Sequence, residues 1–135
     1  MNLAVHREVA AALAARRAVV ALESTVIAHG LPRPQNLAAA RAIEEQVRGL
    51  GSTPATIAIA DGQAVVGADD ALLTRLAEDP AVAKVSLRDL APVLARRGLG
   101  ATTVAATVEI AARTELKARG TPRCVRRSSR PGARR

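Results

Sequence analysis

The chain has 135 residues, about the length of one domain, and 49% of them are hydrophobic although Phe, Tyr and Trp are all absent. No stretch approaches the roughly 18 apolar residues of a membrane-spanning helix, and the first residues lack the apolar segment of a secretory signal, so we expect a soluble cytoplasmic protein. Residues 1–112 carry 11 basic and 11 acidic side chains, so the net charge of +8 lies in residues 113–135. The single cysteine, Cys124, has no partner for a disulfide or for a zinc site.

The first half of the chain predicts two helices and one strand. Apolar side chains recur at helical spacing over residues 3–17, which predicts a helix. The apolar segment 18–22 predicts a buried parallel strand whose C-terminal end opens onto a crevice. Asn36 is expected to cap a second helix that ends at Gly51. The expected apolar face of this helix consists of Leu37, Ala40, Ile43, Val47 and Leu50.

The second half of the chain predicts a hairpin followed by further helices and a strand. Asp61-Gly62 separates two β-like segments, 56–60 and 63–67, and is a strong signal for a tight hairpin turn. Strands that alternate with helices, together with this hairpin, predict a layered α/β/α fold with a mixed sheet. The remaining expected elements are a helix from Asp69 or Asp70 to 78, a strand over 82–86, a helix over 89–97 that ends at Gly98, and a helix over 101–112.

Residues 113–135 are expected to form a basic tail that is separate from the domain of residues 1–112. They show no apolar period and are rich in Arg, Ser, Pro and Gly, which predicts disorder. The charge of the tail could attract nucleic acid without sequence specificity, since no aromatic side chain is present to stack on bases. A shifted reading frame in a GC-rich gene would produce the same composition.

Groups that can transfer protons follow the strand predicted over 18–22. Glu23 comes directly after this strand, where a carboxylate in a partly desolvated crevice can serve as a general acid or base. It could equally be a solvated loop residue or the partner of a helix cap. Ser24 and Thr25 add hydroxyl groups beside it. His29 could relay protons, but a structural histidine bonded to backbone is the favoured interpretation, and no second histidine lies at metal-ligand spacing.

Two further places could bind an anion. Lys84 lies where a strand passes into a loop, and it could hold a phosphate or attack a carbonyl, or be an ordinary exposed lysine. The small residues 98–103 precede a predicted helix, and backbone N–H groups at a helix N-terminus bind anions. This segment matches neither of the common glycine-rich phosphate-binding fingerprints.

Three sequence blocks follow one another along the chain. They read ALESTVIAHGLPRPQN, then PATIAIADGQAVVG, then KVSLRDL followed by GATTVAAT. Together they resemble the N-terminal portion of the pseudouridine-5'-phosphate glycosidases, the family that includes indigoidine synthase A-like proteins. The resemblance runs over residues 16–112 and covers roughly the front third of a family member.

The resemblance implies an oligomeric α/β enzyme that cleaves the C–C glycosidic bond of pseudouridine 5'-phosphate to uracil and ribose 5-phosphate, with a divalent metal, usually manganese (Mn2+). In the family, C1' of the opened ribose is held as a lysine imine, a Schiff base, while an acid protonates the carbon of the departing uracil. By position, Glu23 matches the proton donor, Lys84 matches a substrate-binding lysine, and Val104 matches a substrate contact made through its backbone.

Past residue 112 the chain departs from the family pattern. The glycine-rich segment, the metal-binding aspartate and the imine-forming lysine have no counterpart, and Lys117 does not replace that lysine because its surroundings do not match. We therefore expect a fold that is incomplete at its C-terminal side, no metal site, and no appreciable C–C cleavage by this chain alone. Two other interpretations stay open: a small nonspecific nucleic-acid-binding protein that acts through its tail, and a chain that does not fold stably because its sheet edges are uncovered.

Overall fold

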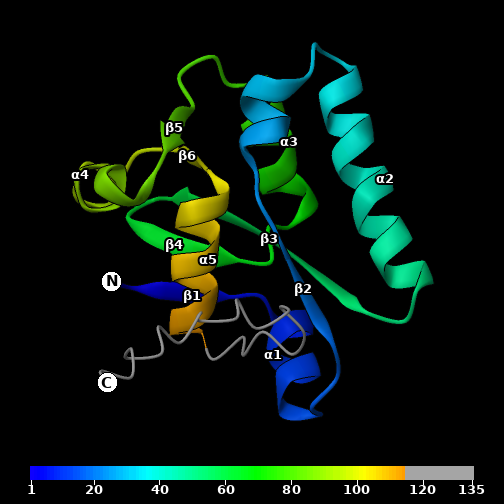
Figure 1. Ribbon diagram of the computed structural model, residues 1–135. Coiled ribbons are helices and arrows are strands. Elements are labelled where there is room, and N and C mark those ends of the chain that lie inside the picture. The colour runs from blue at the N-terminus through cyan, green and yellow to red at the C-terminus, as the bar shows by residue number, and fades with distance from the viewer. Residues whose placement is uncertain (115–135) are drawn as a thin grey trace, which may run out of the picture.

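The strand β3 (Thr53–Ala60) runs through the middle of the sheet (Figure 1). It is buried along its whole length. The structure is a computed structural model, and it describes residues 1–114. The other strands are β1 (Leu3–Val5), β2 (Val19–Leu22), β4 (Gln63–Val66), β5 (Ala83–Val85) and β6 (Gly100–Thr102). They form one mixed sheet in the order β1-β4-β3-β6-β5, and β2 also pairs with β3.

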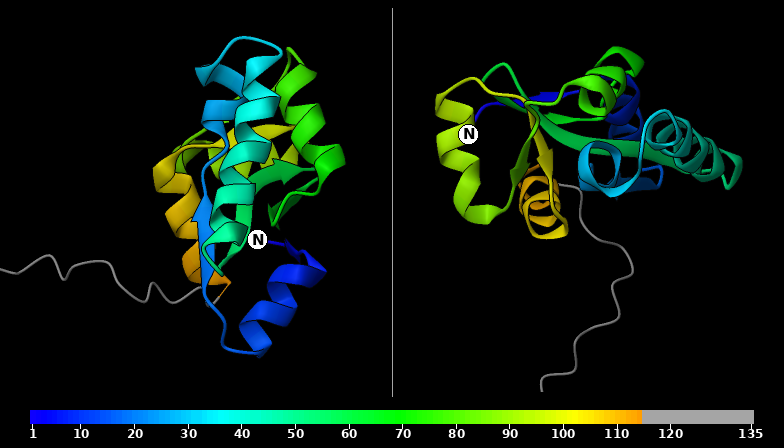
Figure 2. Two further views of the ribbon diagram at one scale, coloured as in Figure 1. Left: turned by 90° about the vertical axis from the view of Figure 1, so that its right-hand side faces the viewer. Right: turned by 90° about the horizontal axis from the view of Figure 1, so that it is seen from above.

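Helices cover both faces of this sheet (Figure 2). They are α1 (Arg7–Ala14), α2 (Gln35–Gly49), α3 (Asp70–Glu78), α4 (Leu90–Ala95) and α5 (Val104–Arg113), together with the π-helix η1 (Val26–Gly30) and the 3-10 helix η2 (Leu87–Asp89). Because successive side chains of a strand point to opposite faces, Ile57 and Ile59 pack with α1, α4 and α5, whereas Ala58 and Ala60 pack with α2 and α3. The layered α/β/α fold with a mixed sheet is therefore confirmed.

Several elements lie where local signals predicted them. Asp61 and Gly62 have φ angles of 53° and 82°, the left-handed geometry of a two-residue hairpin turn, and they join β3 to the antiparallel β4. The Asp69 side chain accepts the N–H of Leu72 at 2.8 Å and so caps α3. The strands β2 and β5 and the helix α4 also fall within their expected ranges.

The helix predicted over residues 3–17 is wrong in its first part. Residues Leu3 and Val5 belong to β1, which pairs parallel with β4, and α1 begins only after His6. The His6 ring accepts the N–H of Glu8 at 3.3 Å and caps that helix. The free edge of β4 supplies the backbone hydrogen bonds that draw these residues into the sheet, and a local pattern does not reveal that edge.

The helix predicted over residues 101–112 begins later than expected. Residues 100–102 form β6, which pairs antiparallel with β3 and parallel with β5. A Cβ atom at Gly100 would lie 2.5 Å from Cγ2 of Val85, so the close approach of these strands depends on the missing side chain. The helix α5 starts at Val104 and is confirmed from there onward.

The second helix starts earlier than predicted, and its predicted apolar face is confirmed only in part, since Ala40 is buried and Leu37 packs against the core. It begins at Gln35, so Asn36 lies in its first turn and is not the cap residue. Ile43 and Leu50, expected to face the core, are 38% and 86% exposed. The face that α2 turns toward the sheet instead carries Asn36 and Glu44, whose side chains form buried hydrogen bonds. These bonds rotate the helix relative to the predicted orientation. The buried residues of α2 are Asn36, Ala40 and Glu44.

The structure bears on the expected absence of a membrane span and on the expected basic tail only for the residues that it describes. Among residues 1–114 no helix is long and apolar enough to cross a membrane. The predicted tail over 113–135, with Lys117 and Cys124, lies outside the described residues from position 115 onward.

Candidate functional site

The strands β2 and β6 meet end to end on the same edge of β3. β2 runs parallel to β3 and ends with Leu22 opposite Thr56, whereas β6 runs antiparallel to β3 with Ala101 opposite Ala58. Continuing both registers by one residue brings the C-terminal ends of the two strands to Ile57. The backbone ladder is interrupted at this residue, and the segments that follow β2 and β6 leave the sheet from the same place.

Hydroxyl groups close this gap in the ladder. Ser24 Oγ and Thr102 Oγ1 both donate to the carbonyl oxygen of Ile57, at 2.6 and 2.7 Å. The N–H of Thr102 donates to Ser24 Oγ at 2.8 Å, and Thr107 Oγ1 lies 2.9 Å from Thr102 Oγ1. Ser24 and Thr102 have no exposed surface. We call the side chains of Ser24, Thr102 and Thr107, with the Ile57 carbonyl, the hydroxyl junction.

Glu23 lies at the end of β2, directly before the hydroxyl junction. Its partly buried carboxylate accepts the N–H of Thr25 on Oε2 at 2.8 Å and the N–H of Val26 on Oε1 at 3.2 Å. These two N–H groups open the helical turn η1, so the carboxylate caps that turn. The capping interpretation is therefore confirmed, and proton transfer by Glu23 stays a prediction.

The capped turn η1 is a π-helix, a rare conformation that is frequent at functional sites. Asn36 holds it in place. The Asn36 amide donates to the carbonyl oxygens of Ile27 in η1 and Ala77 in α3, at 2.9 and 3.0 Å, and its Oδ1 accepts the N–H of Leu37 at 2.8 Å. Sequence reasoning missed this role, because an Asn after two prolines reads as a helix cap and its distant carbonyl partners leave no local signal.

The strand β5 carries Lys84 next to β6. Lys84 lies opposite Ala101 in the parallel pair of strands, and its side chain is exposed. At the end of β5, the carbonyl oxygen of Val85 accepts the N–H of Thr103 at 2.9 Å. The lysine strand is thereby joined to the segment that leads into α5.

A capping box orders the chain directly after β5. The N–H and the hydroxyl of Ser86 donate to Oδ2 of Asp89, at 2.9 and 2.5 Å. The hydroxyl and, to a smaller extent, the backbone N–H hold the pKa of the Asp89 carboxyl below its ordinary value. The turn that follows Lys84 therefore has a defined conformation.

The helix α5 begins beside the hydroxyl junction. Val104, its first residue, has a side chain that is 66% exposed. The N–H groups of its first turn form the positive end of the helix dipole. The Thr103 hydroxyl before them is buried and makes no hydrogen bond within residues 1–114. Hydrogen-bond donors therefore gather at this helix end.

Two of the three predicted site residues are near neighbours in sequence of residues in the hydroxyl junction. Glu23 directly precedes the hydroxyl junction and Val104 follows it by two residues, while Lys84 lies on the next strand of the sheet. His29 is exposed in η1, and its ring makes no hydrogen bond with the residues that the structure describes. The backbone hydrogen bond expected for this histidine is therefore not observed.

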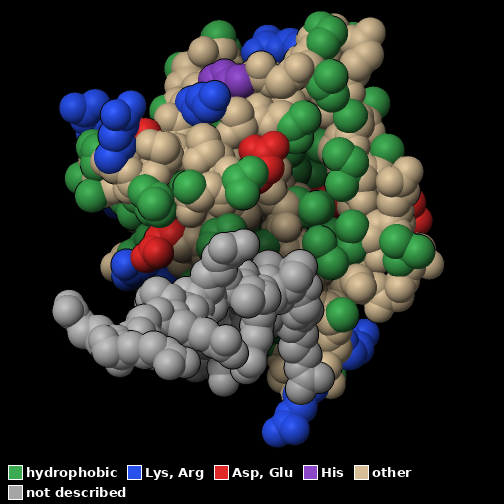
Figure 3. All heavy atoms as spheres, viewed as in Figure 1, with side chains coloured by type: hydrophobic (Ala, Val, Ile, Leu, Met, Phe, Trp, Pro, Cys, Tyr) green, Lys and Arg blue, Asp and Glu red, His purple; other side chains and the backbone are tan. Residues whose placement is uncertain are grey.

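In the view of Figure 3, Lys and Arg side chains of the described residues lie in separate groups, mostly toward the edge of the visible surface. Apolar side chains are scattered over the same visible surface. Val104 and Val108 of α5 are 66% and 62% exposed. Nucleic-acid binding through the basic tail stays a prediction, because the tail lies outside the described residues from position 115 onward.

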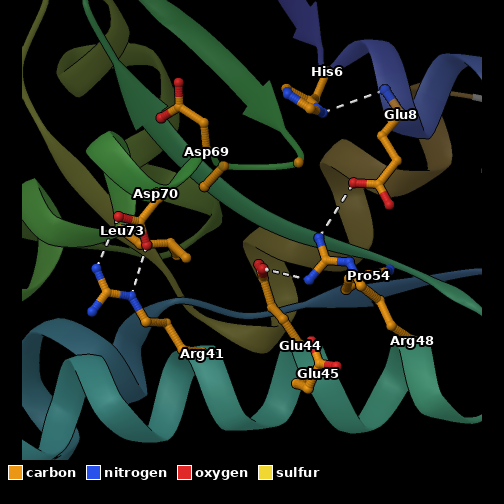
Figure 4. Close-up of a pocket in the computed structure, with 12 residues that line it drawn as sticks. His6, Glu8, Arg41, Glu44, Glu45, Arg48, Pro54, Asp69, Asp70 and Leu73 are labelled. Carbon is orange, nitrogen blue, oxygen red and sulfur yellow. Dashed lines mark hydrogen bonds and ion pairs between the residues drawn. The ribbon is translucent and has the colours of Figure 1, made fainter.

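A separate polar groove of about 410 Å3 lies beside α2 and the start of α3 (Figure 4). Both of its arginines pair with carboxylates: Arg41 donates to both carboxylate oxygens of Asp70, at 2.7 and 2.8 Å, and Arg48 lies 3.3 Å from Glu8 and 3.5 Å from Glu44. The Arg41 guanidinium lowers the pKa of Asp70. No predicted site residue lines this groove, so it is not the candidate site.

Comparison with known proteins identifies the family. The model of the indigoidine synthase A like protein family matches residues 8–122. The chain belongs to this family. The resemblance seen in the sequence is thereby confirmed, and the match extends beyond the predicted domain boundary at residue 112.

Two curated relatives illustrate how far the similarity reaches. The pseudouridine-5'-phosphate glycosidase of Streptomyces griseus is 58% identical over 109 residues, which are 81% of this chain and 34% of the relative. The protein of the same name from Rhodospirillum centenum is 60% identical over 106 residues, 78% of this chain and 33% of the relative. The chain spans about a third of the length of these relatives.

Two solved structures share the fold of the indigoidine synthase A-like chain described above. The prealnumycin C-glycosynthase AlnA, crystallised in complex with ribulose 5-phosphate, is 49% identical with a TM-score of 0.74, over 84% of this chain and 36% of that one. An indigoidine synthase A-like protein from Thermotoga maritima is 30% identical with a TM-score of 0.74, over 84% of this chain and 37% of that one.

Proposed function

We propose that this chain supplies the proton donor and part of the sugar-phosphate site of a pseudouridine-5'-phosphate glycosidase. The reaction cleaves the C–C glycosidic bond of pseudouridine 5'-phosphate to uracil and ribose 5-phosphate. The observation that carries the proposal is the meeting of β2 and β6, because it puts Glu23 and the start of α5 on either side of one junction. The names of the curated relatives and the ribulose 5-phosphate complex of AlnA support the same substrate class.

In this reaction Glu23 is the acid. The electron pair of the breaking C–C bond stays with the uracil ring, and the proton from Glu23 neutralises the ring carbon that carried the sugar. The carboxyl group can carry this proton on Oε1, which makes the longer contact with Val26, while Oε2 keeps the N–H of Thr25. C1' loses the electron pair and needs an electron donor, which the nitrogen of an imine-forming lysine supplies in the family and no residue of this chain supplies in the proposal.

Lys84 and the start of α5 bind the sugar phosphate. Lys84 is exposed and can meet a phosphate as a point charge. The N–H groups around Val104 and the Thr103 hydroxyl are donors suited to phosphate or sugar oxygens. Val104 takes part through its backbone, and a change of its side chain alone should have little effect.

The described residues do not fit the manganese site of the family. Over positions 1–114, no three His, Cys, Asp or Glu side chains are grouped so that they could hold a metal ion. The family's metal-binding aspartate also has no counterpart in the sequence. The role proposed for this chain therefore involves no metal, whereas an oligomeric, cytoplasmic enzyme remains part of the proposal on the family resemblance.

Binding of ribose 5-phosphate to the 135-residue chain tests the proposal. Titration calorimetry should detect binding, and Lys84→Ala should weaken it about 10-fold, since a charge-assisted hydrogen bond is worth about 1.4 kcal/mol or more. Arg75→Ala removes a different exposed cation, which lies on α3, and this variant should bind ribose 5-phosphate as the unsubstituted chain does. The chain alone should release no uracil from pseudouridine 5'-phosphate. Absence of binding, or equal binding by Lys84→Ala, would contradict the proposal.

A further inference from the structure

We propose that Ser24 and Thr102 are positioning residues, which set the proton donor Glu23 against the substrate-binding start of α5. The inference rests on the proposed function and deepens it. Neither hydroxyl is exposed, so neither is expected to touch the substrate. Their effect is exerted through the two chain segments that they join.

The first observation is the arrangement of the sheet. The pairing of β3 with β2 and with β6 stops at Ile57. The carbonyl oxygen of Ile57 therefore receives no backbone N–H from a neighbouring strand on this edge. Ser24 and Thr102 supply two donors, one for each lone pair of that oxygen. The two strand ends are therefore held to a single atom of β3.

The second observation is that each hydroxyl of the pair also accepts a hydrogen bond. The hydroxyl oxygens lie 3.4 Å apart, and the protons of both point to Ile57. Ser24 Oγ accepts the N–H of Thr102, and Thr102 Oγ1 accepts the hydroxyl of Thr107, which starts the second turn of α5. The carbonyl oxygen of Thr102 accepts the N–H of Ser24 and the hydroxyl of Thr25, at 3.2 and 2.9 Å.

These hydrogen bonds have a geometric consequence for the site. Glu23 and Thr25 lie on either side of Ser24, and Val104 lies two residues after Thr102, so the relative position of the two segments is set by short, directional contacts. An apolar side chain of equal size would fill the space without this direction, and it would leave a buried N–H or hydroxyl without a partner. Pre-organised placement of a reacting group is a recognised source of catalytic efficiency.

Nuclear magnetic resonance of the full chain tests this role. Ribose 5-phosphate should shift the amide signals of Val26 and Val104 together in the unsubstituted chain. In Ser24→Ala and Thr102→Val, the ligand should shift Val104 but no longer Val26, and the dissociation constant should rise about 10-fold. Thr102→Ser keeps the hydroxyl and should restore both responses.

Thr56→Val is the matched control, because Thr56 is a buried β3 residue next to Ile57 whose hydroxyl donates to Glu44 of α2 at 2.6 Å and not to a member of the junction. It should lower the melting temperature as Thr102→Val does, yet leave the affinity and both ligand-induced shifts unchanged. A merely structural role for the pair predicts the same response from all these variants. Joint shifts with unchanged affinity in Ser24→Ala would overturn the inference and leave the proposed function standing.

A measurement without variants covers the case in which the substituted chains do not fold. The hydroxyl protons of Ser24 and Thr102 should exchange slowly enough with water to be observed in the unsubstituted chain, and rapid exchange would overturn the inference. Absence of any ligand-induced shift in that chain, with slow hydroxyl exchange retained, would instead contradict the proposed function and remove the positioning role with it.

Discussion

Ser24 and Thr102 lie 78 positions apart in the chain, and the N–H of Thr102 donates to the Ser24 hydroxyl at 2.8 Å. This contact joins the segment after β2 to the segment after β6. Glu23 belongs to the first segment and Val104 to the second, so one buried contact links the predicted proton donor with the predicted substrate contact.

Removal of the Glu23 carboxylate should destabilise the chain through the loss of a cap. In Glu23→Ala the N–H groups of Thr25 and Val26 lose their acceptors, which should lower the free energy of unfolding by about 1 kcal/mol. Glu23→Gln keeps one acceptor oxygen, so its free energy of unfolding should fall by less than that of Glu23→Ala. Thermal unfolding followed by far-ultraviolet circular dichroism measures both, and equal losses would argue against the cap.

Asn36→Ala should be among the most destabilising changes on α2. The buried carbonyl oxygens of Ile27 and Ala77 would each lose a donor, and we expect a loss of about 2 kcal/mol or more in the free energy of unfolding. Gln46→Ala changes an exposed amide on the same helix and should alter stability by less than about 0.5 kcal/mol. Urea titration of the two variants makes the comparison, and similar losses would contradict the role of Asn36.

Two glycine substitutions should have opposite effects. A Cβ atom at Gly100 would lie 2.5 Å from Val85 Cγ2 and 3.3 Å from Val93 Cγ1, so Gly100→Ala should cost about 1–3 kcal/mol through overpacking. At Gly49, in the last turn of α2, a Cβ atom would meet nothing within 4 Å. Gly49→Ala should therefore raise stability, by up to about 1 kcal/mol. A melting temperature for Gly100→Ala at or above that of the unsubstituted chain would refute the close packing of β5 and β6.

Acid should weaken the turn after Lys84. The hydrogen bonds from Ser86 lower the pKa of Asp89 from its ordinary value of 3.8, so the folded chain binds this proton less readily than the unfolded chain does. The stability that Asp89 contributes is therefore present above pH 3.8 and is lost as the pH falls through the lower folded-state value. Melting temperatures of Asp89→Asn and the unsubstituted chain should differ at pH 7 and converge toward pH 3. A constant difference over this range would contradict the prediction.

The salt dependence of binding distinguishes the proposed function from the alternative of nucleic-acid binding. Residues 113–135 carry all of the net charge of +8, so any binding of nucleic acid should decline steeply with salt and vanish when residues 113–135 are deleted. Ribose 5-phosphate binding near Lys84 should persist after this deletion. Fluorescence anisotropy with a labelled oligonucleotide and calorimetry with the sugar phosphate compare the two. Loss of sugar-phosphate binding on deletion would count against the site at Lys84.

Local chemistry was enough to predict the elements whose geometry is decided within a few residues. The turn at Asp61-Gly62 needs two positive φ angles, and these residue types tolerate them at low cost. Asp69 caps α3 with a side chain three residues from the N–H that it accepts. The short Val-rich run of β2 and the family resemblance over 16–112 were recognisable for the same reason, because they depend on contiguous residues.

Elements held by distant partners were not predictable in this way. β1 and β6 contain three residues each, and a three-residue pattern does not distinguish a strand from the start of a helix. Each forms because a strand far along the chain offers an open row of backbone groups. The orientation of α2 likewise follows from the buried hydrogen bonds of Asn36 and Glu44, which apolar periodicity does not register.

The sequence by itself determined the family, the layered fold class, and the candidate residues Glu23, Lys84 and Val104, because contiguous blocks carry that information. Only the tertiary structure decided that the chain after β2 and the chain after β6 leave the sheet at the same carbonyl group. The physical reason is that this meeting depends on the pairing registers of three strands and on hydroxyl hydrogen bonds between remote positions, none of which a local pattern encodes.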